Sequence, residues 1–338
     1  MVLFGYIMKM KAQIAVIGDG GWGTTVAILL ANKGYDVTLW GVFPDYVSVL
    51  KKERVNRKFL PGIKIPGSVR FTSEAVDIKK SAIAVIAIPS KYLRGTLSVF
   101  RGKIGEKAVS LTKGIEEDTL KRPSEVIADV LGPLKIAAVS GPTISFEVAR
   151  SLPTTVVAAS GDEAFAVEVQ NIFTTPNFRA YTSGDIIGVE LGGALKNIIA
   201  IAAGISDGMG FGVNAKAALL TRGLAEIIRF GVKMGAKKET FFGSSGLGDL
   251  ATTCISSHSR NRWFGQEIAK GRKLKDILKE TEMIVEGATT VRSTYELSKK
   301  TGVELPITQK IYELLYHDKK PEDAVRELMT RALKQEEL

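Results

Sequence analysis

Lys196 is the residue of this sequence with the clearest potential for acid–base chemistry. Between Ile186 and Ala203 the only polar side chains are Glu190, Lys196 and Asn197, so the segment is apolar on almost every face. A helix of that kind is buried, and a lysine in it must find a partner, extend its ammonium to solvent or change its pKa. An ammonium that projects into a cleft can instead exchange a proton with an oxygen undergoing reduction or oxidation. At this point both interpretations stay open.

A second lysine and a pair of arginines are candidates for holding an anion. Lys113 follows a predicted strand, at the sheet edge where ligands bind, so its ammonium could hold a substrate oxygen or a phosphate. A solvated loop lysine is the structural alternative. Residues 259–262, Ser-Arg-Asn-Arg, place two guanidinium groups and an amide beside a predicted helix start, where arginines and backbone donors match phosphate. The alternative there is a polar helix cap with surface arginines.

Three further residues could carry chemistry but lack the partners that would define it. Asp249 is the only acid of its predicted loop and could orient a lysine or cap a turn. Cys254 is the only cysteine, which excludes an internal disulfide and suits a reducing compartment. It has no paired Cys or His spacing, so we predict no metal site. His258 has no triad partner in view, and we do not assign it as a base.

Gly18, Gly20 and Gly23 form a Gly-x-Gly-x-x-Gly pattern that begins where four apolar residues of strand character end. A helix of small and apolar residues follows at once, so strand, spacing and helix agree with the dinucleotide-binding fingerprint. Gly18 permits the tight turn, Gly20 lets the backbone approach a pyrophosphate, and Gly23 lets the helix pack on its strand. The first N–H groups of the helix then face the phosphates. A strand-to-helix turn without a ligand is the alternative.

The elements that must position these residues fall into two groups. Alternating strand and helix patterns in the first half predict an α/β fold with a Rossmann-type, doubly wound, mostly parallel sheet. Ligands bind such sheets outside the carboxyl ends of the strands, where Lys113 and the glycine pattern fall. The expected strands cover 13–17, 36–39, 69–71, 83–87, 107–111, 136–139 and 154–159, and helices between them include 22–33, 46–53, 92–100 and 123–131.

After about residue 185 strand patterns largely stop, and the pattern predicts an all-helical second half. We divide the 338 residues into a dinucleotide-binding domain, 1–187, and a substrate-binding domain, 188–338. Two domains are expected because single cores stop growing at about 250–300 residues. A loop is expected over 243–254, which is rich in Gly, Ser and Thr, and helices over 189–204, 215–234, 263–270, 273–279, 289–301, 306–316 and 321–333.

The net charge of +10 comes from short, scattered groups of basic residues, and no run reaches five. We find no nucleic-acid-binding motif and expect no nucleic-acid partner. No apolar run reaches the ~18 residues of a membrane span, so we expect no stable membrane insertion. The apolar residues 1–8 lack the basic leader and the cleavage site of a signal peptide, and Met8 and Met10 are alternative starts.

Short motifs are spread along nearly the whole chain. They include Gly18-Asp-Gly-Gly-Trp-Gly23, Asn56-Arg-Lys-Phe-Leu-Pro-Gly62, Thr112-Lys113-Gly, Ser140-Gly-Pro-Thr143, Glu190-Leu-Gly-Gly-Ala-Leu-Lys196-Asn197, Gly246-Leu-Gly-Asp249 and Val285-Glu286-Gly287. Taken in this order, they resemble the bacterial type of the NAD(P)-dependent glycerol-3-phosphate dehydrogenase family. The resemblance implies reversible hydride transfer between NAD(P)H and dihydroxyacetone phosphate, a small phosphorylated three-carbon substrate. The product is sn-glycerol 3-phosphate, which supplies glycerophospholipid synthesis, and the enzyme is expected to be a cytoplasmic homodimer.

The resemblance also implies roles for individual residues. Lys196 is the general acid and base, and Lys113 contacts the substrate and the cofactor. Arg260 lies near the phosphate and also contacts the cofactor. The remaining expected substrate contacts are Gly141, Thr143, Asp249, Ser259 and Asn261. The remaining expected cofactor contacts are Gly18, Gly20, Gly21, Trp22, Gly23, Ser145, Ile284 and Glu286.

One departure leaves the cofactor, NAD or NADP, open. The second predicted strand is followed by Gly41 and Val42, with neither an acid for a ribose 2′-hydroxyl nor an arginine for a 2′-phosphate. Lys51, Lys52 and Arg54 lie further along the chain. Two other functions are kept as alternatives: a related two-domain hydroxy-acid dehydrogenase, and a dinucleotide-binding or sensing protein without turnover.

Overall fold

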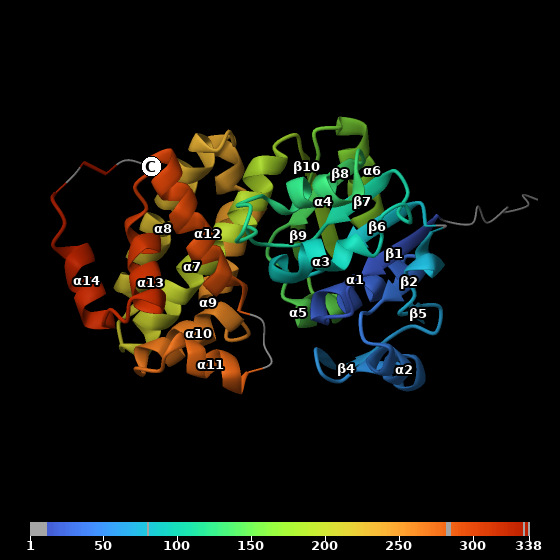
Figure 1. The fold of residues 1–338 in the computed structure, drawn as a ribbon, viewed down its shortest axis with the longest axis horizontal. Coiled ribbons are helices and arrows are strands. Elements are labelled where there is room, and N and C mark those ends of the chain that lie inside the picture. The colour runs from blue at the N-terminus through green and yellow to red at the C-terminus, as the bar shows by residue number, and fades with distance from the viewer. Residues whose placement is uncertain (1–11, 80, 282–284, 334, 337–338) are drawn as a thin grey trace, which may run out of the picture.

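The computed structural model describes residues 12–79, 81–281, 285–333 and 335–336. Figure 1 shows an N-terminal half, where helices surround a sheet, beside a C-terminal half of packed helices. The described residues after 185 contain helices, turns and loops but no strand. This confirms the α/β fold followed by a helical C-terminal region.

The main sheet has eight strands in the order β10-β9-β8-β7-β6-β1-β2-β5. Neighbouring strands run parallel except β8 and β9, which are antiparallel. Because β1 lies between β2 and β6, the chain crosses to opposite sides of β1, and a crevice opens at its carboxyl end. The strands are β1 (Gln13–Ile17), β2 (Asp36–Trp40), β5 (Arg70–Thr72), β6 (Ile83–Ile86), β7 (Lys107–Ser110), β8 (Lys135–Ser140), β9 (Thr154–Ala159) and β10 (Phe178–Ser183).

Helices cover both faces of this sheet, as a doubly wound fold requires. One face packs against α1 (Gly21–Asn32) and α6 (Glu163–Phe173), through residues such as Leu30 and Phe165. The other packs against α3 (Leu93–Ser98) and α4 (Pro123–Leu131), through Leu97 and Val126. The strands are therefore buried on both sides, which explains their nearly unbroken apolar sequences. Two further helices, α2 (Pro44–Glu53) and α5 (Ser145–Ala149), follow the carboxyl ends of β2 and β8, at the sheet edge that binds ligands.

The C-terminal half packs around α7 (Ile186–Gly208), which is buried almost throughout. By length and composition α7 could cross a membrane, but 89% of its apolar window is buried inside the protein, as in the core helix of a globular fold. The surrounding helices are α8 (Val213–Lys233), α9 (Asp249–Ile255), α10 (Arg260–Ala269), α11 (Leu274–Glu280), α12 (Glu286–Thr301), α13 (Pro306–Tyr316) and α14 (Pro321–Met329).

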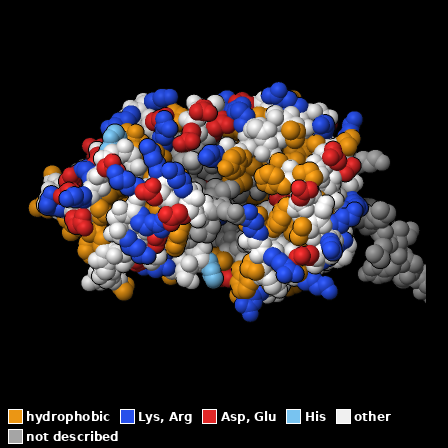
Figure 2. All heavy atoms as spheres, turned by 60° about the horizontal axis from the view of Figure 1, so that its bottom comes forward, with side chains coloured by type: hydrophobic (Ala, Val, Ile, Leu, Met, Phe, Trp, Pro, Cys, Tyr) orange, Lys and Arg blue, Asp and Glu red, His pale blue; other side chains and the backbone are white. Residues whose placement is uncertain are grey.

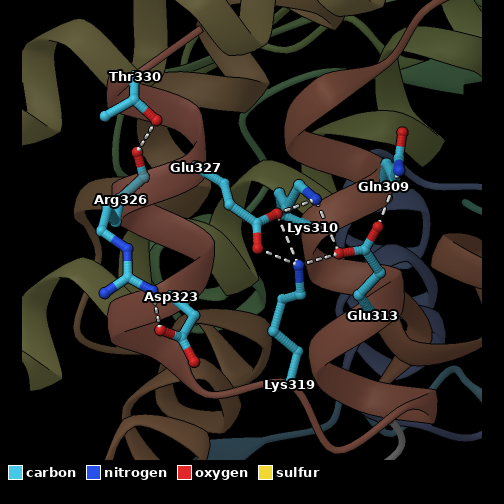
Figure 3. Close-up of polar contacts among 8 residues, drawn as sticks. All are labelled: Gln309, Lys310, Glu313, Lys319, Asp323, Arg326, Glu327 and Thr330. Atoms are coloured by element: carbon cyan, nitrogen blue, oxygen red, sulfur yellow. Dashed lines mark hydrogen bonds and ion pairs between the residues drawn. The ribbon is translucent and has the colours of Figure 1, made fainter.

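The last helix, α14, is held to α13 mainly by charge, as Figure 3 shows. Glu327 of α14 accepts hydrogen bonds from Lys310, at 2.5 Å, and from Lys319, at 2.6 Å. Burial alone would raise the pKa of Glu313, but hydrogen bonds from Lys310, Lys319 and Gln309 lower it to about 2. Only Ala324 of α14 is buried. These ionic contacts are only partly shielded from water, so salt weakens them.

Basic side chains are distributed widely over the face of the molecule that Figure 2 draws. On the face in Figure 2, lysines and arginines are spread among acidic and apolar side chains. This distribution agrees with the scattered basic groups of the sequence.

The structure differs from the predicted elements in several places. The loop expected over 243–254 is wrong, because Ser244–Gly248 form a π-helical turn that leads directly into α9. The helix expected over 321–333 ends at Met329. The six-residue edge strand β10 and the hairpin of β3 (Val55–Asn56) and β4 (Leu60–Lys64) were not expected. The domain division at 187/188 stays a proposal; α7 begins at Ile186, with Asp185 capping it through a 2.9 Å bond from the Gly188 N–H.

Candidate active site

The glycine loop joins β1 to α1 at the crevice of the sheet. Gly18 has a φ of +115°, which other residues rarely adopt, and its N–H donates to the Trp40 carbonyl at the end of β2 over 2.9 Å. Gly20 has no neighbouring atom within 4 Å of the position a Cβ would take. That open side, at the N-terminus of a 12-residue helix, fits a pyrophosphate. A Cβ on Gly23 would lie 1.9 Å from the Gly18 carbonyl oxygen, so close packing also requires glycine there.

The hairpin of β3 and β4 supports this loop. The Asn56 amide donates to the Asp19 carbonyl at 2.8 Å and to the Thr24 hydroxyl at 2.7 Å. Gly21 lies against the backbone of Phe59, where a Cβ would come within 2.7 Å of the carbonyl oxygen. The motif that begins at Asn56 therefore holds the dinucleotide loop in place.

Lys196 does not reach solvent; it is buried in α7 and its ammonium has two partners from α9. Its Nζ lies 2.9 Å from Asp249 Oδ1 and donates to the Thr253 hydroxyl at 2.6 Å. Thr253 donates in turn to the Asp249 carbonyl over 2.7 Å. Asp249 itself is 1% exposed, so the ion pair is shielded from water. The charged lysine therefore stays inside the protein, beside the loops of the sheet.

Lys113 reaches the same carboxylate from the N-terminal half. Its Nζ lies 2.5 Å from Asp249 Oδ2 and 3.1 Å from the Gly141 carbonyl oxygen, with the Thr143 hydroxyl at 3.4 Å. Burial lowers the pKa of Lys113 to about 8, although Asp249 opposes the shift, and the charge of Lys196 lowers it further. The carboxylate of Asp249 thus brings two ammonium groups, one from each half, to one place.

Glu286, the first residue of α12, adds a second acid to this cluster. Burial raises the pKa of its carboxyl, while the charges of Arg260, Lys196 and Lys113 act to lower it. The site therefore holds more than one acid among its cations. A proton can be redistributed within such a coupled group.

Asn261 connects three helices below Lys196. Its amide donates to Asn197 Oδ1 at 2.9 Å, and its own oxygen accepts from the Gly287 N–H at 3.0 Å. The Nδ2 group of Asn197 is buried and has no hydrogen-bond partner among the described residues. An unpartnered donor next to Lys196 is available to a ligand oxygen.

The two arginines of the 259–262 motif have different surroundings. Ser259 caps α10, accepting from the Arg262 N–H at 3.3 Å. Arg262 lies 2.5 Å from Asp207 and is structural. Arg260 is exposed in the first turn of α10 and acts electrostatically on Glu286. Among the described residues Arg260 has no ion-pair partner, so its exposed guanidinium can meet an anion from solvent.

Other expected cofactor residues lie near the glycine loop without a contact that defines their role. Trp22 is partly buried against the core of the N-terminal half. The backbone carbonyl of Ser145 accepts from the Thr25 hydroxyl at 3.2 Å, which places the start of α5 beside α1. Ile284 lies outside the described residues. Their roles toward a cofactor stay predictions.

Two residues of the site were missed from the sequence. Thr253 stands four positions after Asp249, the spacing that places two side chains on one helical face. The loop predicted over 243–254 hides that signal, because the spacing has meaning only in a helix. Asn197 is visible in the sequence as a polar residue of an apolar helix, but only the structure shows its unpartnered amide.

A glycine loop opening a helix at the crevice of a Rossmann-type sheet, with two lysines on one buried acid, defines a dinucleotide-dependent dehydrogenase. Residues 13–166 match the family model described as the NAD-dependent glycerol-3-phosphate dehydrogenase N-terminus. Residues 185–326 match the model for the C-terminus of the same family. The chain belongs to the NAD-dependent glycerol-3-phosphate dehydrogenase family.

Individual relatives agree with this assignment along nearly the whole chain. A protein of Geobacter sulfurreducens, named glycerol-3-phosphate dehydrogenase (NAD(P)+), is 49% identical over 97% of this chain and 99% of its own length. A crystal structure of glycerol-3-phosphate dehydrogenase from Coxiella burnetii superimposes with a TM-score of 0.91, at 37% identity, over 95% of this chain and 100% of that one. A D-mandelate dehydrogenase, at 14% identity and a TM-score of 0.62, shares the fold.

Proposed function

We propose that this protein reduces dihydroxyacetone phosphate to sn-glycerol 3-phosphate with NAD(P)H, and catalyses the reverse reaction. The observation that carries the proposal is the pairing of Lys196 and Lys113 on the two oxygens of Asp249, at 2.9 and 2.5 Å. The family and the named relatives support the choice of substrate. The cofactor supplies the hydride, and the residues of the chain supply the binding groups and the proton.

Lys196 is the proton donor for the substrate carbonyl oxygen and the acceptor in the reverse direction. Hydride delivery builds negative charge on that oxygen, and two buried ammonium groups stabilise it far better than water does. Asp249 is a positioning residue, because it fixes both lysines. Thr253 keeps a second hydrogen bond on Lys196, at 2.6 Å, so that its ammonium holds one orientation.

Arg260 and the start of α10 bind the substrate phosphate in this account. Arg260 is exposed in the first turn of a ten-residue helix, where the backbone N–H groups and the helix dipole also favour an anion. Gly141 and Thr143 line the substrate beside Lys113. The Asn197 amide, which has no partner among the described residues, is a donor for a substrate hydroxyl.

Initial rates with purified protein test the proposal. Dihydroxyacetone phosphate and simple 2-keto acids such as pyruvate are compared, each with NADH and with NADPH. We expect turnover of the phosphorylated ketone and little turnover of the keto acids. Preference for a keto acid would favour the hydroxy-acid dehydrogenase. Dinucleotide binding without any turnover would favour the sensing protein.

We also propose a cytoplasmic homodimer that supplies sn-glycerol 3-phosphate for glycerophospholipid synthesis. The family resemblance supports this setting, and the single, buried Cys254 suits a reducing compartment. Light scattering on the purified protein measures its mass in solution. A mass of one chain, at concentrations where the enzyme is active, would contradict the dimer.

A further inference from the structure

The end of β2 is where this fold distinguishes NAD from NADP. An acid there accepts the ribose 2′-hydroxyl of NAD, whereas an arginine holds the 2′-phosphate of NADP. In this chain β2 ends at Trp40 and is followed by Gly41. Residues 41–50 contain one acid, Asp45, and no lysine or arginine. Neither the acid that binds the ribose of NAD nor the arginine that binds the 2′-phosphate of NADP is therefore present at the end of β2.

A carboxylate from the glycine loop occupies that position instead. A Cβ on Gly41 would lie 2.2 Å from Asp19 Oδ2, so the Asp19 side chain fills the space that a side chain at 41 would take. Glycine at 41 is required by this arrangement. Asp19 stands between Gly18 and Gly20, in the loop that approaches the dinucleotide.

The placement of Asp19 is fixed by its surroundings. The Gly18 N–H donates to the Trp40 carbonyl at 2.9 Å, which ties the glycine loop to the end of β2. The Asn56 amide and the Thr24 hydroxyl both donate to the Asp19 carbonyl, at 2.8 and 3.2 Å. Three hydrogen bonds therefore fix the backbone around Asp19, and its carboxylate lies against Gly41.

One oxygen of this carboxylate lacks a partner. Asp19 Oδ2 is buried and accepts no hydrogen bond from any described residue. Buried acceptors are almost always paired in folded proteins, so an unpaired one calls for a donor that a ligand would bring. Burial raises the pKa of Asp19, against a backbone hydrogen bond that lowers it, as expected for a carboxylate deprived of donors.

The nearest basic residues along the chain are directed elsewhere. The guanidinium of Arg54 donates to the carbonyls of Val69, at 2.6 Å, and Pro66, at 3.3 Å, and lies over the ring of Phe71. Lys51 and Lys52 are in the last turn of α2, about 10 Å of helix away from its first turn. None of the three balances the Asp19 charge at the end of β2.

We propose that Asp19 selects the cofactor: its Oδ2 accepts a hydrogen bond from the adenosine ribose of NAD(H), and its charge rejects the 2′-phosphate of NADP(H). A 2′-phosphate would bring about −1.5 to −2 charges against a carboxylate on which no cation acts among the residues that the structure describes. In this chain the acid that binds the ribose thus lies in the glycine loop and not at the end of β2. The inference rests on the proposed function only in requiring a dinucleotide at this loop.

Direct binding tests this inference without turnover. Dissociation constants for NADH and NADPH are measured by calorimetry, at one ionic strength, on the full-length protein. We expect the wild-type protein to bind NADH at least about tenfold more tightly than NADPH, the size of one charge-assisted hydrogen bond. Equal affinities, or tighter binding of NADPH, would overturn the proposal without any variant.

Variants then assign the preference to Asp19. Asp19→Asn should weaken NADH binding, strengthen NADPH binding and bring the two dissociation constants within about threefold of each other. Asp45→Asn removes the same charge from the exposed first turn of α2 and should leave the ratio as in the wild type. An unchanged ratio in Asp19→Asn, or an equal change in Asp45→Asn, would refute the assignment.

A double variant keeps the inference testable if Asp19→Asn fails to fold. In Asp19→Ser with Gly41→Arg, the carboxylate leaves the space that a side chain at 41 takes, and Val47 Cγ2, at 2.8 Å from the new Cβ, must also shift. The arginine supplies a cation, so NADPH should bind more tightly than NADH. Retained NADH preference in this folded double variant would contradict the proposal. If the protein fails to reduce dihydroxyacetone phosphate but its NADH preference depends on Asp19, the proposed reaction fails and this inference stands.

Discussion

Lys196 Nζ lies 2.9 Å from Asp249 Oδ1, in an ion pair of which both side chains are less than one-tenth exposed. The other carboxylate oxygen binds Lys113, so a single acid sets the positions of both cations. Asp249→Asn keeps the shape but removes the charge that holds the two ammonium groups together. We expect kcat/KM to fall by about 100-fold, the typical cost of misplacing catalytic groups.

The pH profile separates this positioning role from a merely structural one. Asp249 raises the pKa of Lys113 against burial and the charge of Lys196, so without it Lys113 should lose its proton more readily. The alkaline limb of kcat/KM should then move to lower pH. Asp276→Asn, on an exposed face of α11, is the control and should match the wild type. A profile of unchanged shape in Asp249→Asn would show that the acid does not govern the lysines.

The pKa of Lys113 predicts the pH at which activity declines. Because burial lowers its pKa to about 8, the ammonium is charged below that pH and neutral above it. Substrate oxygen and phosphate bind the charged form, so kcat/KM should decrease as pH rises through about 8. Arginine stays charged across this range, so the decline in Lys113→Arg should move to higher pH, whatever its absolute rate. A wild-type rate that stays constant between pH 7 and 10 would contradict the assignment.

Arg260 should contribute mainly to binding of the phosphate. Arg260→Ala is expected to raise KM for dihydroxyacetone phosphate by about 10- to 100-fold, because a charge-assisted hydrogen bond is lost. The rate with unphosphorylated dihydroxyacetone should change little. Arg326→Ala, an exposed arginine on α14, is the matched control. If both substrates lose activity equally, the phosphate is bound elsewhere.

Replacement of Glu190 should lower the stability of the protein rather than its catalytic rate. This buried carboxylate of α7 accepts from Arg122, at 2.6 Å, and from the Ser124 N–H and hydroxyl, each at 2.7 Å, at the start of α4. Glu190→Ala removes the acceptor of the Ser124 N–H and the buried ionic partner of Arg122, which keeps only Glu125, at 3.2 Å, and the Ser124 hydroxyl, at 3.1 Å. It should lower the free energy of unfolding by about 3–5 kcal/mol.

Denaturant unfolding measures that loss, and Glu190→Gln is the graded control. The glutamine keeps an acceptor for Ser124 but not the charge for Arg122, so its loss should be intermediate. Because Glu190 joins a helix of each half, both halves should be affected. A stability equal to that of the wild type in Glu190→Ala would show that this contact is dispensable.

Much of the fold was predictable from local sequence. The apolar runs of β1 and β6 and the proline-started helices α4 and α13 are determined by their own residues, and the predicted bounds of α4 and α13 agree with the structure. The strand β10 was missed because it is an edge strand with several exposed side chains. Residues 243–254 were missed because small polar residues favour loops, and packing against α7 overrides that local preference.

The site was predictable where function depends on residue type and not where it depends on contacts between distant segments. Lys196 stands out in an apolar helix, and the glycine loop has its own spacing. Asp249 pairs with Lys113, 136 positions away in the sequence, and with Lys196, 53 positions away. No local sequence pattern contains these contacts. Asp19 is a similar case, because its proximity to Gly41 follows from the pairing of β1 with β2.

The most direct test of the account is the turnover of Lys196→Ala with dihydroxyacetone phosphate and NADH. We predict that kcat falls by about 10²- to 10⁴-fold, the usual contribution of a general acid, while the NADH dissociation constant and the circular dichroism spectrum stay at their wild-type values. A kcat within about twofold of the wild type would contradict the assignment of Lys196 as the proton donor.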